Sequence, residues 1–415
     1  MKKMAKNPLH CSFCGRNRDE VKILIAGQEG HICENCVEHA REIIEQELVT
    51  KDDRTPSSFK LTVKKPVEIK KFLDEYVIGQ DEAKRVLAVA VYNHYKRLQQ
   101  KTGDSTSDVE IEKSNIIMVG ETGTGKTLLA KTIARLLNVP FAIVDATVFT
   151  EAGYVGEDVE SILTRLLQVC NYDVPAAERG IVYIDEIDKI ARKGDNPSIT
   201  RDVSGEGVQQ GMLKLLEGTD VLVPPQGGRK HPEQKLIKIN TQNILFICGG
   251  AFDGIDKVIA RRVQTNTIGF NVDKELQDNM KKNLLRYVNA PDLKTFGLIP
   301  ELLGRLPVVT HLDPLDAPTL RAILTEPKNA LIKQYKKLFE LEGINLSIDN
   351  PVLDFMVEKA VEYKLGARGL RSICESILTD AMFELPSTNE KTFMLDIEYA
   401  KRKFETSKIS LLKVA

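Results

Sequence analysis

The chain has 415 residues, 42% of them hydrophobic and 28% charged, and a formal net charge of -1. This length is too great for a single compact core and predicts two or three domains of ordinary globular composition. The balanced charge disfavours proteins that bind nucleic acid or anionic membranes by bulk electrostatics. The sequence shows no apolar run of membrane-spanning length and no apolar signal core after Met1. We therefore expect a cytoplasmic protein with neither membrane nor nucleic acid as a partner.

Two pairs of closely spaced cysteines stand near the N-terminus. The pairs have the form Cys-x-x-Cys and comprise Cys11, Cys14, Cys33 and Cys36. This spacing predicts one tetrahedral zinc ion with four thiolate ligands, and because no coordination position stays open, the zinc is expected to be structural. A segment of this size buries little core, so the metal would supply most of its folding energy. Three neighbouring histidines are alternative ligands that we expect at the surface instead: His10, His31 and His39.

The stretch that follows the cysteines, residues 51–66, is polar and charged and lacks helical periodicity. It predicts a flexible linker, which would let the cysteine module move relative to the rest of the chain. The sequence Val-Ile-Gly-Gln stands at residues 77–80, and apolar residues at helical spacing then predict a helix over residues 81–100. Val77 and Ile78 could line an apolar pocket for a flat ring, but core packing is the simpler interpretation.

A phosphate-loop pattern, G-x-x-x-x-G-K-[ST], is formed by Gly120, Glu121, Thr122, Gly123, Thr124, Gly125, Lys126 and Thr127. Residues 115–119 before it predict a buried strand, and residues 128–137 after it, beginning with Leu128, predict a helix. Glycines let successive backbone N–H groups surround a phosphate, and the helix N-terminus favours an anion. Lys126 would then reach the β- and γ-phosphates, and Thr127 would ligate magnesium. The pattern predicts a site for ATP or a related nucleotide, with Leu128 beside it.

An apolar run over residues 180–184 ends in two acids, Asp185 and Glu186. At the carboxyl end of a parallel strand they would lie beside the phosphate loop, where Asp185 can hold magnesium and Glu186 can orient and deprotonate the attacking water. The structural alternative is that Asp185 only caps the next helix. Strands alternate with helices here, as in residues 141–145 and 159–170. This alternation predicts an α/β fold with a parallel sheet that helices cover on both faces.

These features, in this order and spacing, resemble the AAA+ superfamily of P-loop NTPases and, within it, the Clp family of unfoldases. The resemblance covers essentially the whole chain. It implies an ATP-dependent protein unfoldase and polypeptide translocase, a homohexamer that recognises unfolded or tagged substrates and delivers them to the ClpP peptidase. It also implies chaperone-like remodelling, no peptidase activity of the chain itself, and possible adaptor proteins that bind the zinc module. The implied cofactors are ATP, magnesium and zinc.

The residues and the resemblance together set the expected domain boundaries. The expected parts are a zinc-binding module (1–50), a flexible linker (51–66), a large AAA+ nucleotide-binding domain (67–313) and a smaller C-terminal α/β domain (314–415). Within the last of these, an apolar stripe over residues 370–381 predicts a buried helix. Strand character is expected only over residues 344–348 and 392–397 of that domain.

Three loops acquire roles through the resemblance, although the residues alone would describe them as turns or buried segments. The residues implied to touch a polypeptide in the central channel of the ring are Tyr154, Val155, Arg201, Arg229, Lys230 and His231. The tripeptide Ile268-Gly269-Phe270 is implied to dock into hydrophobic clefts on the peptidase ring. This tripeptide is the feature that best predicts a peptidase partner.

Two arginines are implied to complete the nucleotide site. Arg305 matches an arginine finger that reaches the γ-phosphate of the neighbouring subunit, and Arg368 matches a sensor arginine that contacts the phosphates of its own subunit. Each could instead be an ordinary surface arginine. The sequence departs from many AAA+ proteins at Gly249 and Gly250, because no Asn or Thr ends the strand there to help position the water. We therefore assign no such first-sensor residue.

Two functions of other classes stay open at this point. One is an AAA+ motor that acts on DNA and uses the zinc module to bind nucleic acid. The weak net charge and the aromatic loop at Tyr154 disfavour it. The other is a zinc adaptor that uses nucleotide only as an assembly switch. Processing of substrate without the first 50 residues would argue against giving the zinc module that main role.

Overall fold

The computed structural model describes residues 9–27, 30–41, 63–99, 111–150, 157–192, 205–225, 236–266, 283–363 and 365–407. The chain divides into two compact units, Met1–Leu61 and Thr62–Ala415. Their division falls inside the segment predicted as a linker, and the first helix of the larger unit, α2, begins at Pro66. The further division at residue 313 stays a prediction. No helix in the described ranges is long and apolar enough to cross a membrane.

The N-terminal unit is a small module built on a hairpin. Strand β1 (Leu24–Ala26) pairs antiparallel with β2 (His31–Cys33) after a short 3-10 turn, η1 (Arg18–Glu20), and residues 34–41 are helical. Among the hydrophobic side chains that the structure describes in this unit, only Cys11 and Cys33 are buried. So few buried side chains cannot hold a fold together by the hydrophobic effect alone, as expected for a metal-supported module.

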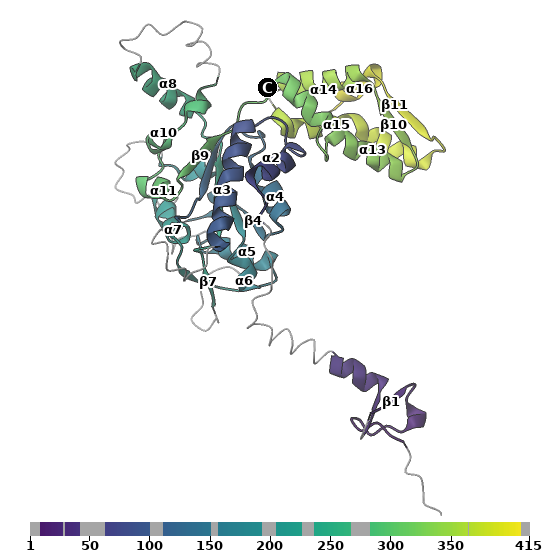
Figure 1. Cartoon of the computed structure of the whole chain (residues 1–415). Coiled ribbons are helices and arrows are strands. Elements are labelled where there is room, and N and C mark those ends of the chain that lie inside the picture. The colour runs from purple at the N-terminus through teal and green to yellow at the C-terminus, as the bar shows by residue number, and fades with distance from the viewer. Residues whose placement is uncertain are drawn as a thin grey trace, which may run out of the picture. The chain divides into compact units, whose positions relative to one another are not determined.

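The larger unit contains a five-stranded parallel sheet with the strand order β4-β5-β8-β3-β9. Its two edge strands, β4 and β9, are labelled in Figure 1. Its strands are β3 (Ile116–Val119), β4 (Phe141–Asp145), β5 (Ile181–Asp185), β8 (Leu245–Gly250) and β9 (Val308–His311). Every residue of β3 and β8 is buried, as is usual for the inner strands of a parallel sheet covered on both faces. The carboxyl ends of β3, β5 and β8 therefore meet at one edge, where such folds bind ligands.

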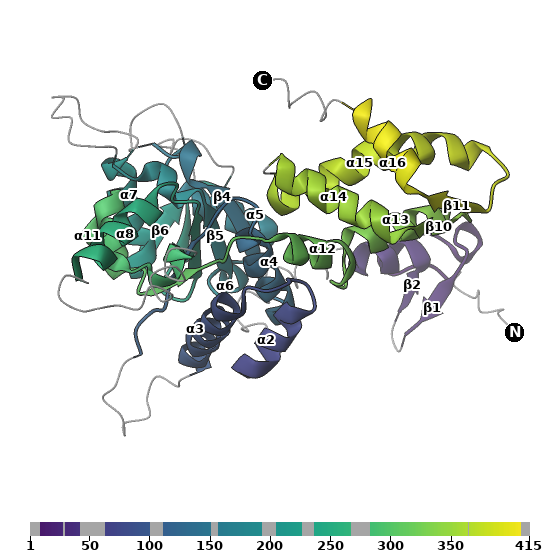
Figure 2. The same ribbon diagram turned by 90° about the horizontal axis from the view of Figure 1, so that it is seen from above.

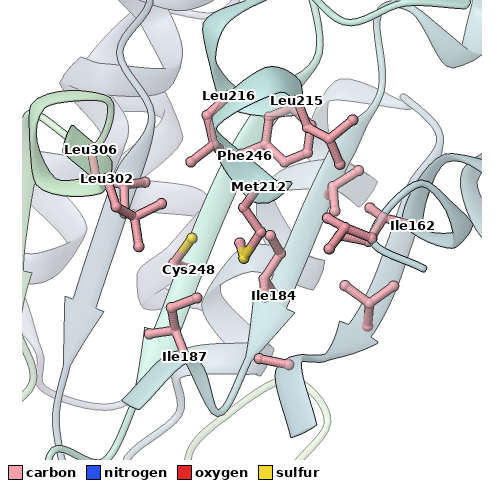
Figure 3. Close-up of a cluster of buried hydrophobic side chains, with 14 of the residues drawn as sticks. Ile162, Ile184, Ile187, Met212, Leu215, Leu216, Phe246, Cys248, Leu302 and Leu306 are labelled. Carbon is pink, nitrogen blue, oxygen red and sulfur yellow. The ribbon is translucent and has the colours of Figure 1, made fainter. Parts of the chain in front are cut away.

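Helices cover both faces of this sheet, as the sequence predicted. The helices are α2 (Pro66–Asp74), α3 (Asp81–Gln99), α4 (Lys126–Leu137), α5 (Ser161–Val169), α6 (Val174–Ala177), α7 (Glu206–Glu217), α8 (Ile255–Asn266), α10 (Ala290–Phe296) and α11 (Pro300–Gly304). On one face, α3 contacts β3 and β9, and α4 contacts β5 and β8. On the other face, Ile184 and Phe246 of the sheet pack with Ile162 of α5, Met212 of α7 and Leu302 of α11 (Figure 3).

Shorter elements connect these layers. They are the 3-10 turns η3 (Ala146–Val148), η4 (Ile187–Ile190) and η5 (Leu284–Tyr287), and the strands β6 (Asp220–Val223) and β7 (Ile237–Asn240). Strands β6 and β7 form an antiparallel hairpin apart from the main sheet. The alternation of strands and helices in the sequence does not predict this hairpin.

The C-terminal part of the larger unit has its own hydrophobic core. Its elements are α12 (Ala317–Thr325), α13 (Leu331–Leu341), β10 (Asn345–Ile348), α14 (Asn350–Glu362), α15 (Gly366–Glu384), η6 (Leu385–Ser387), β11 (Thr392–Leu395) and α16 (Ile397–Glu405). The two predicted strands pair in parallel beside α13 (Figure 2). The predicted stripe lies on α15 and is buried, with Leu370, Ile373 and Ile377 at the centre of the core.

Helix α4, which follows β3, is flanked at both ends by a residue with a left-handed backbone conformation. Gly125 precedes the helix with φ +106°, a conformation that costs glycine little. Asn138 ends it with φ +54°, and its N–H donates to the carbonyls of the last turn. The helix begins at Lys126 rather than at the predicted Leu128. This earlier start places Lys126 and Thr127 in the first helical turn, where backbone N–H groups lack helical partners.

Candidate functional site

The phosphate loop lies between β3 and α4, with its glycines in conformations that a side chain would oppose. Gly123 has φ +87°. A Cβ on Gly120 would stand 2.9 Å from Cβ of Leu312, so the loop also packs closely on the segment after β9. The ammonium of Lys126 donates to the carbonyls of Gly120 and Glu121, and burial lowers its pKa. The loop therefore surrounds the ammonium group of Lys126.

A cavity of about 800 Å³ opens beside this loop. The predicted site residues that line it are Thr122, Gly123, Gly125, Lys126, Thr127, Leu128, Asp185, Glu186 and Arg368. It is also lined by residues that the sequence did not single out, among them Tyr76, Arg135, Asp188, Asp253, Gln334, Ala367 and Arg371. The start of α15 stands against the loop, because a Cβ on Gly123 would lie 3.6 Å from the backbone N of Ala367. The cavity therefore has walls from both the sheet domain and the C-terminal helices.

The two acids stand at the carboxyl end of β5, beside the loop. Oδ2 of Asp185 accepts a hydrogen bond of 3.2 Å from the hydroxyl of Thr127, and Oδ1 accepts one of 3.0 Å from the backbone N–H of Glu186. Glu186 precedes η4 with φ +55° and ψ 34°, so Asp185 is not the N-cap of that turn. A left-handed backbone at a glutamate is uncommon and is often retained for function. Here it presents the Glu186 side chain, which is exposed, to the cavity.

Tyr183, two residues before Asp185, is a site residue that the sequence did not reveal. Its hydroxyl donates to Oδ1 of Asp185 at 3.2 Å, and its ring is completely buried. Burial raises the pKa of Tyr183, so the hydroxyl keeps its proton and acts as a donor. Within the apolar run over residues 180–184 it resembles any other core aromatic, and only its two-residue spacing from Asp185 hints that both side chains share one face.

The pocket predicted for a flat ring differs in detail from the prediction. Val77 is buried and its Cγ1 lies 3.8 Å from where a Cβ on Gly125 would stand, whereas Ile78 is partly exposed. Neither residue lines the cavity, but the neighbouring Tyr76 does, with the guanidinium of Arg135 4.2 Å from its ring centroid. Contacts of Val77 and Ile78 with a nucleotide therefore stay predictions, and Tyr76 offers the flat ring surface.

Gln80 connects the loop region to the segment that leads to the C-terminal helices. Its side-chain amide donates to the carbonyl of Asp313 at 2.8 Å and accepts from the N–H of the same residue at 2.7 Å, across 233 positions of sequence. The same Nε2 lies 3.5 Å from the carbonyl of Thr124. Both Gly79 and Gln80 have positive φ values, which aim this side chain at Asp313. The contact ties the phosphate loop to the chain between the two cores.

Four of the remaining predicted residues do not line the cavity. Gly120 and Glu121 offer carbonyls to Lys126, and the Thr124 hydroxyl donates to the carbonyl of Glu121 at 2.8 Å, so these residues shape the loop. Arg305 lies elsewhere, and its Nη2 donates to Oε1 of Glu217 at 3.0 Å.

The predicted channel and docking residues lie outside the described residues, and their roles stay predictions: Tyr154, Val155, Arg201, Arg229, Lys230, His231, Ile268, Gly269 and Phe270.

The four N-terminal cysteines form one cluster. Their sulfur atoms all lie within 4.8 Å of one another, Sγ of Cys14 is 3.6 Å from Sγ of Cys33, and none of the four forms a disulfide. Tetrahedral zinc with Zn–S bonds near 2.3 Å places its sulfurs about 3.8 Å apart, so this cluster fits the ion. Burial raises the pKa of the Cys11 thiol, but hydrogen bonds from the backbone of Cys14, Phe13 and Cys33 lower it to about 6. No histidine belongs to the cluster among the described residues.

Removal of zinc is expected to unfold the N-terminal unit and to spare the larger one. Hydrogen exchange in the nucleotide-free chain, before and after a strong chelator, measures this. Amides of β1 and β2 should lose protection, whereas those of β3 and β8 should keep it, because the small unit has almost no buried apolar side chains. Added zinc should restore protection. Unchanged exchange in β1 and β2 after complete metal removal would contradict a structural role.

Comparisons with known proteins agree with this geometry. Family models match residues 9–46 as a ClpX C4-type zinc finger, residues 111–309 as an AAA domain of the Cdc48 subfamily, and residues 315–393 as the C-terminal D2-small domain of ClpB protein. The chain is 64% identical over 414 residues to the ATP-dependent Clp protease ATP-binding subunit ClpX of Bacteroides thetaiotaomicron, covering 99% of each chain. It is 61% identical to the same subunit of Porphyromonas gingivalis, covering 95% of this chain and 96% of that one. The chain belongs to the ClpX family of Clp protease ATP-binding subunits.

Proposed function

We propose that the protein is an ATP-dependent unfoldase and polypeptide translocase that recognises protein substrates and delivers them to the ClpP peptidase. The observation that carries this proposal is the cavity that joins the phosphate loop, the acids of β5 and Arg368 of α15, in a chain 64% identical over 414 residues to a Clp protease subunit. The chain would supply ATP hydrolysis and mechanical work, and the partner would supply peptide-bond cleavage. It would act in the cytoplasm, and remodelling of proteins without degradation would use the same motor.

Different residues of the cavity would contact different parts of the nucleotide. Tyr76, with Val77 and Ile78 nearby, would face the base, and the N–H groups of the loop with Lys126 would surround the phosphates. Arg368 would reach the phosphates from α15. Apart from Ile78, each of these residues already lies at the cavity or against the loop. Binding would therefore hold the start of α15 against the phosphate loop.

Magnesium would be held by Thr127 and Asp185. Two oxygen ligands of an octahedral magnesium ion lie about 2.9 Å apart, and Oγ1 of Thr127 stands 3.2 Å from Oδ2 of Asp185, so the pair fits the ion. The ion, when bound, neutralises charge on the β- and γ-phosphates. Glu186 would orient the attacking water and accept its proton, since its carboxylate is exposed at the cavity and the positive φ of its backbone aims it there.

The conformational change caused by nucleotide binding would be transmitted to the substrate through the segment that joins the two hydrophobic cores. Gln80 holds Asp313 by two hydrogen bonds and stands next to the carbonyl of Thr124, so a shift of the phosphate loop would be felt at this joint. In a homohexamer such motions would displace the loops that carry Tyr154 and the other channel residues. Adaptors would bind the zinc module, and Ile268-Gly269-Phe270 would dock on the peptidase.

Degradation of a stable, tagged reporter protein tests this function. The chain should destroy its fluorescence with ATP and ClpP, and should unfold it with ATP alone when a trap captures the unfolded form. Phe270→Ala should abolish ClpP-dependent degradation while ATPase and trapped unfolding persist, because only the docking contact is removed. Met394→Ala, which truncates an exposed apolar side chain of β11, is the matched control and should degrade the reporter normally.

Three results would contradict the proposal. Normal degradation by Phe270→Ala would remove the docking role of the tripeptide. ATPase activity that duplex DNA stimulates and unfolded protein does not would instead support the alternative motor on DNA. A chain that binds ATP but neither hydrolyses it nor unfolds the reporter would support the adaptor alternative.

A further inference from the structure

The space above Gly249, near the end of β8, is filled by a side chain from the neighbouring strand. A Cβ on Gly249 would stand 2.2 Å from the hydroxyl oxygen of Tyr183 and 2.9 Å from its Cζ, distances that no real Cβ tolerates. Tyr183 lies on β5, opposite Ile247 of β8. Its ring therefore runs along β8 toward the strand end, and the absence of a side chain on Gly249 leaves room for the hydroxyl.

The hydroxyl in that space touches the carboxylate of Asp185, the proposed magnesium ligand. Tyr183 donates to Oδ1 of Asp185 at 3.2 Å, and the backbone N–H of Glu186 donates to the same oxygen at 3.0 Å. The other oxygen, Oδ2, accepts from the hydroxyl of Thr127 at 3.2 Å. One oxygen is thus held from inside the sheet, while the other faces the cavity beside Thr127. This asymmetry fixes which oxygen is presented to a cation.

We propose that Tyr183 is a positioning residue for magnesium: its hydroxyl, in the space that Gly249 leaves, holds Asp185 so that Oδ2 faces the ion of the ATP complex. The inference rests on the proposed magnesium role of Asp185. The Tyr183 hydroxyl contacts both proposed ligands, Asp185 and Thr127, and would act on the ion only through them. Without it, Oδ1 would keep only the Glu186 N–H, and the carboxylate could rotate between orientations. Loss of such an outer contact typically weakens metal binding by about 10–100-fold.

Tyr183→Phe in the full chain is the direct test, because it removes one oxygen and keeps the ring. Binding of a fluorescent ADP analogue is measured while magnesium is titrated, and again in excess chelator. We expect the magnesium concentration for half-maximal tightening to rise by about 10-fold, with nucleotide affinity in chelator unchanged. ATPase at low magnesium should fall and should recover as magnesium is raised. If Tyr183 had a purely structural role, the magnesium dependence of nucleotide binding and that of ATPase activity would both stay unchanged.

Tyr95→Phe is the matched control. Tyr95 is also completely buried, and its hydroxyl donates to the carbonyl of Arg179 at 3.1 Å, so this change removes one buried hydrogen bond without touching Asp185. It should leave the magnesium titration as in the unmodified chain. Equal shifts in both variants would overturn the inference, since they would reflect a general loosening of the fold. No shift in Tyr183→Phe would overturn it as well.

Gly249→Ala provides a second, independent test. The added methyl would push the hydroxyl away from Asp185, so its magnesium defect should match that of Tyr183→Phe. The double variant should be no worse than either single one, because both act through one contact. Additive defects would overturn the inference. Asp185→Asn separates the two proposals: if it keeps full magnesium dependence, the metal role of Asp185 itself fails, whereas a defective Asp185→Asn beside an unchanged Tyr183→Phe overturns only the role of Tyr183.

Discussion

Glu186→Gln is expected to keep ATP bound and to slow its hydrolysis by about 10²–10⁴-fold, the usual contribution of a general base. The amide has nearly the shape of the carboxylate but cannot accept the proton of the attacking water. The carboxylate lines the cavity and makes none of the contacts that build the loop, which come from Lys126 and Thr124. Binding should therefore survive the change.

Single-turnover hydrolysis and equilibrium binding of ATP measure the two halves of this expectation. Glu390→Gln is the matched control, because Glu390 is an exposed glutamate after η6, remote in sequence from the cavity residues, and its change should leave both quantities unaltered. Slow hydrolysis together with lost binding would indicate a damaged site instead of a missing base. Hydrolysis at the normal rate would remove Glu186 from the reaction altogether.

Local sequence was sufficient for the parts of the site that depend on neighbouring residues. The phosphate loop, the strand before it and helix α4 follow from glycine placement and apolar periodicity over a few residues, and the structure has all three. The cysteine cluster follows from the spacing of its pairs. The ends of elements were less exact: α5 begins at Ser161, two residues after the predicted start, because the preceding residues form a turn that periodicity cannot distinguish from helix.

Contacts between distant segments were not available from the sequence. The bond from Gln80 to Asp313 spans 233 positions, and nothing in either residue type identifies the other as its partner. Tyr183 looks like a core residue until β5 and β8 are placed side by side. Tyr76 reaches the cavity while the predicted Val77 packs on the loop, because α2 and the turn after it set the direction of each side chain. Tertiary placement, and not residue type, decides these roles.

The departure at Gly249 and Gly250 has a physical explanation in this packing. A Cβ on Gly250 would stand 2.7 Å from Oδ1 of Asp188 and 2.6 Å from the ring of Phe252. Oδ1 of Asp188 in turn accepts from the N–H of Ala251 at 3.1 Å. The polar groups at this strand end therefore come from β5 and η4. Both positions require glycine, because any side chain there would clash with these groups.

Arg305→Ala is expected to reduce ATP hydrolysis by about 10³–10⁵-fold, the usual worth of an arginine finger. The guanidinium follows α11, is 52% exposed, and pairs only with Glu217 among the described residues. It does not line the cavity of its own chain, so a role in hydrolysis requires a second subunit. Arg165→Ala is the matched control, because that side chain is also partly exposed, at 37%, and pairs with one glutamate, Glu157. It should hydrolyse ATP normally.

Mixing two inactive variants shows whether the site is shared between subunits. In rings assembled from equal amounts of Arg305→Ala and Glu186→Gln chains, about a quarter of the interfaces join an intact Glu186 to an intact Arg305, because a head-to-tail ring pairs each site with one neighbour. Activity should return at those interfaces. If Arg305 served its own chain, every subunit would still lack one group and the mixture would stay inactive. Recovered hydrolysis would thus show that Arg305, which contacts Glu217 within its own chain, completes the ATP site of the neighbouring subunit.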